Sequence, residues 1–217
     1  MDTPSRTALV AGASGLVGGA LLDTLLEDPR YREVHGLGRR EVPRAHPKLR
    51  QHTVDFARLE ALPAADDAFC CLGTTIKKAG SQQAFRAVDH DAVLAFARAA
   101  QKAGVQRFVV VTALGANARS LVFYNRVKGE TEEALKALGF ASLVIAQPSL
   151  LLGERTERRL GEHVATVASR LLAPLLRPLA SRPIEARTVA RALVVLAHAA
   201  PPGTRVVPSG ELQTLGA

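Results

Sequence analysis

The sequence GASGLVG at residues 12–18 directly follows an apolar run, residues 7–11, and opens an amphipathic stretch. Three of the chain's 17 glycines, Gly12, Gly15 and Gly18, fall in this single turn at intervals of three. Glycine suits a place where a side chain would obstruct a close approach. A strand, a glycine-rich turn and a helix form the context of a dinucleotide-binding fingerprint, in which the glycines permit the bend, admit a pyrophosphate and bring the helix close to the strand. A tight turn without any ligand is the simpler alternative.

Outward from this turn, strand-like runs alternate with helix-like stretches. Apolar runs predict strands at residues 7–11, 33–37, 52–54, 68–72, 107–113, 141–146 and 204–207. Amphipathic patterns predict helices at residues 16–28, 82–104, 125–138 and 185–198. Such alternation is typical of βαβ units, so we expect an α/β fold with a Rossmann-type doubly wound parallel sheet.

The pattern changes after about residue 148. The stretch HVATVASRLLAPLLRPLA, residues 163–180, is strongly amphipathic and is interrupted by Pro174 and Pro178. It predicts a helix that packs over the sheet or over a substrate cleft, and a membrane-surface helix is the alternative. We therefore expect residues 1–217 to form a single NAD(P)-binding Rossmann domain with a small C-terminal helical region, about 148–217, that caps the substrate side.

Composition places the chain among globular proteins of the reducing cytoplasm. It has 47% hydrophobic and 22% charged residues, and no apolar run reaches the roughly 18–20 residues of a membrane span. The N-terminus lacks the pattern of a secretory signal. The only cysteines, Cys70 and Cys71, are adjacent, and neither they nor the six histidines have the spacing of metal ligands. We expect a cytoplasmic location and no bound metal.

The net charge of +8 raises the question of an anionic partner. Basic residues are spread along the chain, and aromatic residues, at 4%, are too few for a platform on which bases stack. We therefore expect no specific nucleic-acid partner. The sequence does not indicate an oligomeric state.

The end of the second predicted strand bears on the choice of cofactor. In NAD-binding chains an acidic residue there usually accepts a hydrogen bond from the ribose 2′-hydroxyl. Here residues 35–40 read HGLGRR, without an acid, so Arg39 and Arg40 could bind a 2′-phosphate. A solvated basic turn is the alternative. Asp55 and Phe56, after the third strand, are placed to contact adenine.

The segment Tyr124-Asn125-Arg126-Val127-Lys128 holds one of only two tyrosines, four residues before a lysine. On a helix these two side chains share a face. An ammonium beside a phenol favours the phenolate, which makes the tyrosine a usable proton donor to a carbonyl oxygen. An exposed Tyr and a solvated Lys on a helix surface would give the same spacing.

Taken together, GASGLVG, GRR, VDF and YNRVK resemble an atypical short-chain dehydrogenase/reductase. Four longer blocks resemble the Tat-interacting-protein oxidoreductase branch and its bacterial relatives: CCLGTTIKKAG at 70–80, VDHDAVLAFA at 88–97, YNRVKGETE at 124–132 and QPSLLLGERTERRLGE at 147–162. The resemblance extends over about residues 7 to 200.

The resemblance implies an NADP(H)-binding protein with residue-specific roles. Tyr124 would be the proton donor, and Lys128 would bind the nicotinamide ribose and tune Tyr124. The other implied cofactor contacts are Ser14, Gly15, Leu16 and Val17 at the pyrophosphate, Arg39 and Arg40 at the 2′-phosphate, Leu72 and Gly73 at the ribose, and Leu151 and Arg159 at the nicotinamide end.

The chain departs from the family pattern at two positions. The family's serine after the fifth strand corresponds to Thr112, which is followed by Ala113. Thr112 can donate the same hydrogen bond, or it can be only a residue at the end of a strand. Asp89 stands where extended family members often carry Asn.

Three functions are compatible with these patterns. The first is an NADPH-dependent reductase of an unidentified small carbonyl compound, with Tyr124, Lys128 and Thr112 as catalytic residues. The second is an NADPH-sensing regulatory protein with little or no turnover. The third, a nucleic-acid binder, rests on net charge alone. The substrate cannot be read from the sequence, because shape rather than motif decides it.

Overall fold

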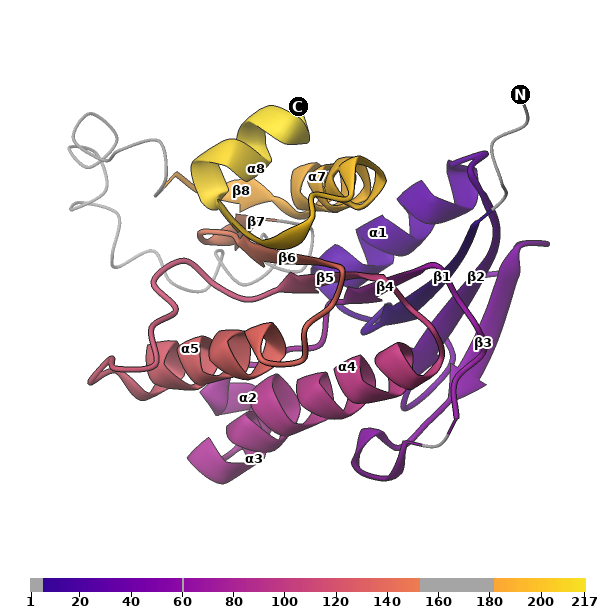
Figure 1. Ribbon diagram of the computed structural model, residues 1–217. Helices are drawn as coiled ribbons and strands as arrows, with labels where there is room; N and C mark the ends of the chain where they lie inside the picture. The colour runs from indigo at the N-terminus through magenta and orange to yellow at the C-terminus, as the bar shows by residue number, and fades with distance from the viewer. Residues whose placement is uncertain (1–5, 60, 153–181) are drawn as a thin grey trace.

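Seven parallel strands form one sheet in the order β3-β2-β1-β4-β5-β6-β9 (Figure 1). The computed structural model describes residues 6–59, 61–152 and 182–217. The strands are β1 (Arg6–Ala11), β2 (Tyr31–Gly38), β3 (Leu49–Thr53), β4 (Asp67–Cys70), β5 (Arg107–Val111), β6 (Ser142–Gln147) and β9 (Gly203–Pro208). The direction of strand succession reverses beside β1, and in such sheets the crevice at the carboxyl ends of the strands is the usual ligand site.

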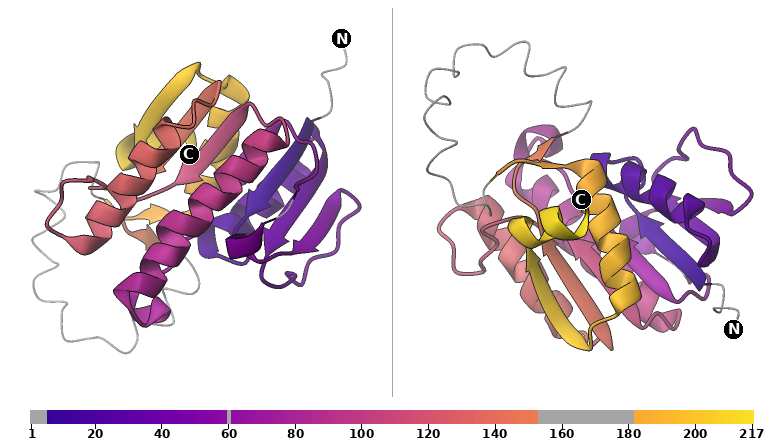
Figure 2. Two further views of the ribbon diagram at one scale, coloured as in Figure 1. Left: turned by 60° about the horizontal axis from the view of Figure 1, so that its bottom comes forward. Right: turned by 90° about the horizontal axis from the view of Figure 1, so that it is seen from above.

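Helices cover both faces of the sheet (Figures 1 and 2). One face carries α1 (Leu16–Glu27), α7 (Ala186–Ala199) and α8 (Ser209–Leu215). The opposite face carries α4 (Val93–Lys102) and α5 (Phe123–Lys136), preceded by the short helices α2 (Ile76–Ala79) and α3 (Gln82–Arg86). The doubly wound parallel sheet predicted from the sequence is therefore confirmed.

The alternation of side chains along each strand builds two separate cores. In β1, Ala8 and Val10 pack toward α1 and α7, whereas Leu9 and Ala11 pack toward α4. All four are fully buried. A strand that is apolar on both faces must be covered on both faces, which explains why these runs show no polar alternation.

The chain between residues 82 and 104 is less regular than the sequence predicts. It consists of α3, a π-helical turn at Ala87–Ala92, and α4. Turns of this type are rare and are frequently found at functional sites.

A second, two-stranded parallel sheet was not anticipated. It pairs β7 (Leu151–Leu152) with β8 (Ile184–Glu185). Two-residue strands leave no periodicity in a sequence. The predicted amphipathic stretch 163–180 lies outside the described residues. Within the part of the chain that is described, no helix has both the length and the apolar character needed to cross a bilayer.

The described residues after 148 belong largely to the sheet and its covering layer. β9 pairs with β6, and α7 packs against α1. The expectation that residues 148–217 cap the substrate side also concerns residues 153–181, which lie outside the described residues, and it stays a prediction.

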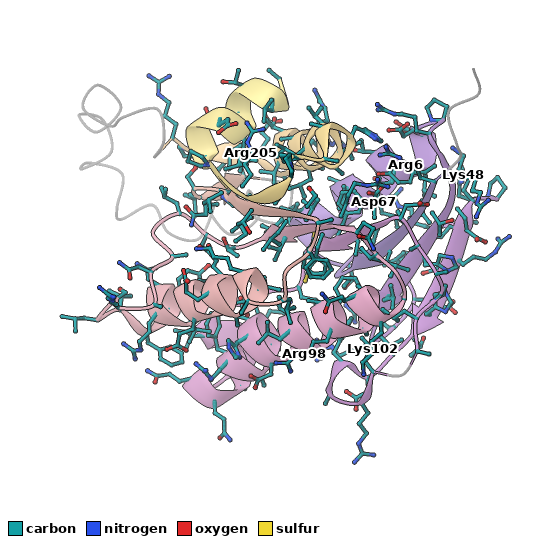
Figure 3. All side chains as sticks on the ribbon, in the orientation of Figure 1. Arg6, Lys48, Asp67, Arg98, Lys102 and Arg205 are labelled. Carbon is teal, nitrogen blue, oxygen red and sulfur yellow. The ribbon has the colours of Figure 1, made fainter. Side chains whose placement is uncertain are left out.

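A polar network joins the amino ends of the strands to the ends of α1 and α7. The fully buried Asp67 accepts a 2.8 Å hydrogen bond from the Tyr31 hydroxyl and lies 3.7 Å from Arg6 (Figure 3). Arg6 in turn contacts Nδ1 of His198 at 3.0 Å, and Nε2 of His198 contacts Asp28 at 3.0 Å. This network lies at the amino ends of the strands, whereas the glycine-rich turn lies at their carboxyl ends. It therefore supports the fold rather than a cofactor site.

Candidate cofactor and catalytic site

The glycine-rich turn brings the ends of β1 and β4 into contact. Gly12 has φ = +89°, a conformation that side-chain-bearing residues rarely adopt. A Cβ at Gly12 would lie 2.6 Å from the carbonyl oxygen of Cys71, so only glycine fits there. Leu72 and Gly73, which follow Cys71, are therefore held beside the turn, at the crevice where the strand order reverses.

Gly15 and Gly18 bring α1 close to this turn. A Cβ at Gly18 would lie 2.7 Å from the carbonyl carbon of Gly12 and closer still to its oxygen, and one at Gly15 would lie 3.1 Å from the same oxygen. Gly15 is the N-cap of α1 and supplies no side-chain hydrogen bond to the first turn. The backbone N–H groups of that turn and the positive end of the helix dipole suit a phosphate.

The side chains of the turn differ in how accessible they are to a cofactor. Ser14 is exposed, Leu16 is half-buried, and Val17 is only 5% exposed within the core formed with α7. A contact from Val17 to a cofactor would therefore use its backbone rather than its side chain.

The two arginines that follow β2, both predicted to bind a 2′-phosphate, have different surroundings. Both Arg39 and Arg40 are exposed. Arg40 lines a small hollow together with Ser14 and Gly38, whereas Arg39 does not. Glu41 lines the same hollow. The motif HGLGRR stops one residue short of this acid, so sequence reasoning missed a carboxylate beside the predicted ribose site.

Asp55 and Phe56 have structural contacts of their own. The Asp55 carboxylate caps a short 3₁₀ turn at Phe56–Arg58 by accepting a 2.9 Å hydrogen bond from the Ala57 N–H. Phe56 is 8% exposed and packs into the core under α4. It also lines a hollow of about 550 Å³ between this turn and α4. The predicted contact with adenine stays a prediction for both residues.

Tyr124 and Lys128 lie one turn apart on the face of α5 that packs against the rest of the protein. Tyr124 is half-buried, and its ring packs against Phe85 with a centroid separation of 5.3 Å. Lys128 is only 4% exposed. The alternative of a solvated surface lysine is therefore wrong.

Lys128 forms an ion pair with Asp89, which lies in the π-helical turn. Its Nζ lies 2.8 Å from Oδ1 of Asp89, whose residue is 1% exposed. Oδ2 accepts a 2.9 Å hydrogen bond from the Thr74 N–H. Burial raises the pKa of Asp89 above its usual value, and the Lys128 charge together with the Thr74 hydrogen bond opposes that rise. The amino-acid spacing gave no sign of this partnership.

Gly73, in the segment after β4, lies close to this pair. A Cβ there would lie 3.4 Å from Oδ1 of Asp89 and 3.8 Å from Nζ of Lys128. Gly73 itself is exposed, and Leu72 is half-buried. The structure therefore brings together Gly73 and Lys128, the two residues to which the family resemblance assigns contacts with the ribose, and those contacts stay a prediction.

The buried residues Thr112 and Glu132 form a hydrogen-bonded cluster with the half-buried Gln147. Its hydroxyl donates a 2.6 Å hydrogen bond to the Glu132 carboxylate, and the Gln147 amide donates 3.0 Å hydrogen bonds to both oxygens of that carboxylate. A hydroxyl has one hydrogen to donate. The Ala146 carbonyl oxygen lies farther from this hydroxyl, at 3.3 Å, so the shorter contact assigns the hydrogen to Glu132. A catalytic role for Thr112 stays a prediction.

Glu132 itself was missed by sequence reasoning, although a signal was present. It follows Tyr124 by eight residues and Lys128 by four, which places all three on one face of α5. It is 4% exposed.

The remaining predicted residues divide into described and undescribed ones. Leu151 is half-buried in β7, where it pairs with Ile184. Arg159 lies outside the described residues.

Cys70 is fully buried, and burial raises the pKa of its thiol to about 12. Burial likewise raises the pKa of Cys71 far above its usual value, so both side chains stay as thiols.

A family model described as NAD(P)H-binding matches residues 12–198. Among curated proteins, the chain is 36% identical over 170 residues to "Protein FMP52, mitochondrial" of Eremothecium gossypii, covering 76% of each chain. It is 36% identical over 168 residues to "Protein HTATIP2" of Rattus norvegicus, covering 74% of this chain and 69% of that protein.

Solved structures share the fold at lower identity. An oxidoreductase of the short-chain dehydrogenase/reductase family from Burkholderia thailandensis superposes with a TM-score of 0.72 at 20% identity, covering 97% of this chain and 94% of that one. The human epimerase family protein SDR39U1 with NADPH gives a TM-score of 0.63 at 18% identity, with coverages of 94% and 77%. MoeE5 in complex with UDP-glucose and NAD gives 0.70 at 21% identity, with coverages of 97% and 81%.

Proposed function

The chain belongs to the NAD(P)H-binding family of Rossmann-fold, short-chain dehydrogenase/reductase-like proteins that includes relatives of HTATIP2 and FMP52, and on this premise we propose that it is an NADPH-dependent reductase of a small carbonyl compound. The observation that supports the proposal most is Lys128, buried one helical turn from Tyr124 and beside Gly73. We further propose the cytoplasm as its location. The word "mitochondrial" in the fungal names is a statement about those proteins.

Three features suit a dinucleotide. The N-terminus of α1 has no side-chain hydrogen bond from its N-cap and suits a pyrophosphate, Gly12 and Gly18 keep the turn free of side chains, and Lys128 offers ammonium hydrogens beside Gly73. When bound, the nicotinamide would supply a hydride to the carbonyl carbon. Tyr124 would give its hydroxyl proton to the carbonyl oxygen, which completes the alcohol. Lys128 would hold the ribose hydroxyls, and its charge would stabilise the phenolate that remains.

Our preference for NADPH over NADH rests on Arg40. Arg40 and Ser14 line the same hollow, and a 2′-phosphate bound there would accept hydrogen bonds from the Arg40 guanidinium. Glu41 lines the same hollow and would suit a 2′-hydroxyl instead. We propose that Arg40 has more effect than Glu41 on the choice of cofactor, because a hydrogen bond between a guanidinium and a phosphate joins two charged groups.

The chain's two tyrosines provide a test with a built-in control. Tyr124→Phe removes the proton donor but keeps the ring against Phe85, so turnover should fall by about 10²–10⁴ while NADPH affinity stays the same. Tyr31→Phe removes a buried hydroxyl at the amino ends of the strands, far from the glycine-rich turn. It should therefore lower the stability of the fold and leave turnover unchanged. Turnover is measured as NADPH oxidation against a panel of aldehydes, ketones and quinones. Equal turnover by wild type and Tyr124→Phe would refute the proposed role of Tyr124.

A second candidate function is favoured by the Thr112 cluster. The hydroxyl hydrogen that the family's serine would direct to substrate is here directed to Glu132. A protein that binds NADPH and contacts a partner without turnover would tolerate this arrangement. Tight NADPH binding with no oxidation of NADPH by any carbonyl compound in the panel would support this function over the reductase.

A further inference from the structure

A hollow of about 550 Å³ lies on the face of the sheet opposite to α1, between α4 and the segment that follows β3. One wall is the 3₁₀ turn and the chain after it, with Phe56, Leu59 and Leu62. The other wall is α4, with Ala95 and Ala99. We call this site the α4 hollow. Its volume falls in the range of about 300–1,000 Å³ that is typical of small-molecule sites.

The α4 hollow owes its space to alanines on α4. Ala95, Ala99 and Ala103 recur every four residues, which places them on one face of the helix. All three are half-buried, and Leu59 and Leu62 of the opposite wall are partly buried as well. Both walls therefore present apolar surface, and an apolar body bound between them would be removed from water.

Three cations surround this apolar space. Arg98 and Lys102 extend from successive turns of α4 (Figure 3), and Arg58 ends the 3₁₀ turn in the opposite wall. All three residues are exposed. In the described ranges 6–59, 61–152 and 182–217 none of them forms an ion pair, whereas Lys136 of α5 pairs with Glu133 at 2.8 Å. An anion placed among the three cations would reduce their mutual repulsion.

The α4 hollow is separate from the proposed cofactor site. Helix α4 connects the parallel strands β4 and β5, so it runs antiparallel to them, and Lys102 and Ala103 lie toward their amino ends. The glycine-rich turn lies at the carboxyl ends. Of the described residues predicted to bind the cofactor, only Phe56 lines the α4 hollow, and neither Tyr124 nor Lys128 does. A ligand of this hollow can therefore bind while the crevice is occupied.

We propose that the α4 hollow binds a small amphipathic anion, a carboxylate on an unbranched alkyl chain. The chain lies between the alanines of α4 and the leucines opposite, and the carboxylate lies beside Arg98 and Lys102. A hollow with two walls and this volume suits a small molecule better than a peptide, which takes an extended groove or a sheet edge. The site goes beyond the proposed function and does not depend on it.

The first experiment locates the ligand. Protein labelled with ¹³C in its alanine methyl groups is titrated with decanoate, below the concentration at which decanoate forms micelles. The Ala99 signal is identified as the one missing from Ala99→Phe, and it should shift during the titration. Ala199, an exposed alanine of α7 on the other face of the sheet, is identified through Ala199→Gly and should not shift. The shift of Ala99 should be the same with saturating NADPH present.

The second experiment tests the role of the cations. Arg98→Gln/Lys102→Gln removes two charges from exposed positions, so the fold should be retained. Its dissociation constant for decanoate, measured by calorimetry at low salt, should be about three- to tenfold higher than that of wild type. The matched control Arg187→Gln changes an exposed arginine of α7 and should bind as wild type does. Decanol, which has the same chain without the charge, should bind the double variant and wild type equally.

Two further variants test the space and the loop. Ala99→Phe fills the α4 hollow with a ring and should abolish decanoate binding. Glu60 lies between two lining residues in the sequence and is outside the described residues. Glu60→Gln removes a negative charge from this loop, so it should bind decanoate at least as tightly as wild type. Weaker binding by Glu60→Gln would contradict an anionic ligand.

The other outcomes are equally decisive. An unshifted Ala99 signal, or equal affinity of wild type for decanoate and decanol, would overturn the proposal. Equal losses in Arg187→Gln and the double variant would mean that net charge, not the α4 hollow, attracts decanoate. If Ala99→Phe does not fold, the double variant still decides. A shift of Ala99 with a peptide of alternating Glu and Leu, but not with decanoate, would assign the hollow to a peptide and refute a small ligand. Absence of NADPH binding would refute the proposed function alone.

Discussion

The neighbouring glycines Gly18 and Gly19 of α1 predict opposite effects of the same substitution. A methyl group at Gly18 would lie 2.7 Å from the backbone carbon of Gly12 and closer still to its oxygen. At Gly19 the nearest atom would be the Ala13 oxygen at 3.4 Å, an ordinary van der Waals distance. Both positions are helical with negative φ, so backbone conformation does not distinguish them.

The magnitudes follow from these distances. Replacing glycine by alanine inside a helix contributes about 0.5–1 kcal/mol of stability where the methyl group fits. Gly19→Ala should therefore raise Tm by about 1–4 °C for a chain of this size. Gly18→Ala requires α1 and the glycine-rich turn to separate, and such overpacking typically costs about 1–3 kcal/mol or more. Because the clash is with backbone atoms, we take the upper value of about 3 kcal/mol, and subtraction of the helical gain leaves a net loss of about 2 kcal/mol, or a Tm about 4–8 °C below that of wild type.

The assay is thermal unfolding of the three proteins, followed by circular dichroism, together with NADPH titration. Gly18→Ala should also weaken NADPH binding, because the displaced Gly12 carbonyl belongs to the predicted pyrophosphate turn. Gly19→Ala should bind NADPH as wild type does. Equal melting temperatures for the two variants would refute the close contact between α1 and the turn.

Four further predictions concern other parts of the molecule. Burial alone would raise the pKa of Asp28, but hydrogen bonds from Arg30 and His198 lower it to about 2. Acidification from pH 4 to pH 2 should therefore reduce the free energy of unfolding by about 2 kcal/mol. The variant Asp28→Asn should not show this loss. Burial also lowers the pKa of His198, so the stability of wild type should already begin to fall below about pH 6.5, as seen in urea titrations at several pH values. Arg40→Ala should weaken NADPH binding by about tenfold or more with little effect on NADH, whereas equal losses for both would contradict a 2′-phosphate contact. Glu132→Leu removes the carboxylate that accepts hydrogen bonds from the buried Thr112 hydroxyl and the half-buried Gln147 amide, so it should lower the unfolding free energy by about 1–3 kcal/mol, and an unchanged Tm would argue against the cluster.

Local patterns were enough to predict the architecture. Apolar runs such as 107–113 need cover on both faces, and the amphipathic stretches between them supply it, so the alternation itself encodes the doubly wound sheet. The spacing of Tyr124 and Lys128 encodes a shared helix face in the same way. These features depend on neighbours within one or two turns of chain.

Long-range partners could not be predicted from these patterns. Nothing near Lys128 indicates that its counter-ion is Asp89, because the two come from different helices. Phe56 reads as a loop residue beside an adenine site, yet its ring packs into the core because α4 offers an apolar surface there. Similarly, the hydrogen of Thr112 goes to Glu132 only because β5 ends beside α5.

The π-helical turn at Ala87–Ala92 has a consequence for how this site varies between proteins. A π-helical turn amounts to an α-helix with one residue inserted, and removal of that residue would rotate the preceding chain by about 100° and shift it by about 1.5 Å. Asp89 would then leave the line to Lys128 although every residue type was retained. The ion pair is therefore specified by the length of the segment as much as by its composition, and a single-residue gap in a relative would abolish the pair while leaving both charged residues present in its sequence.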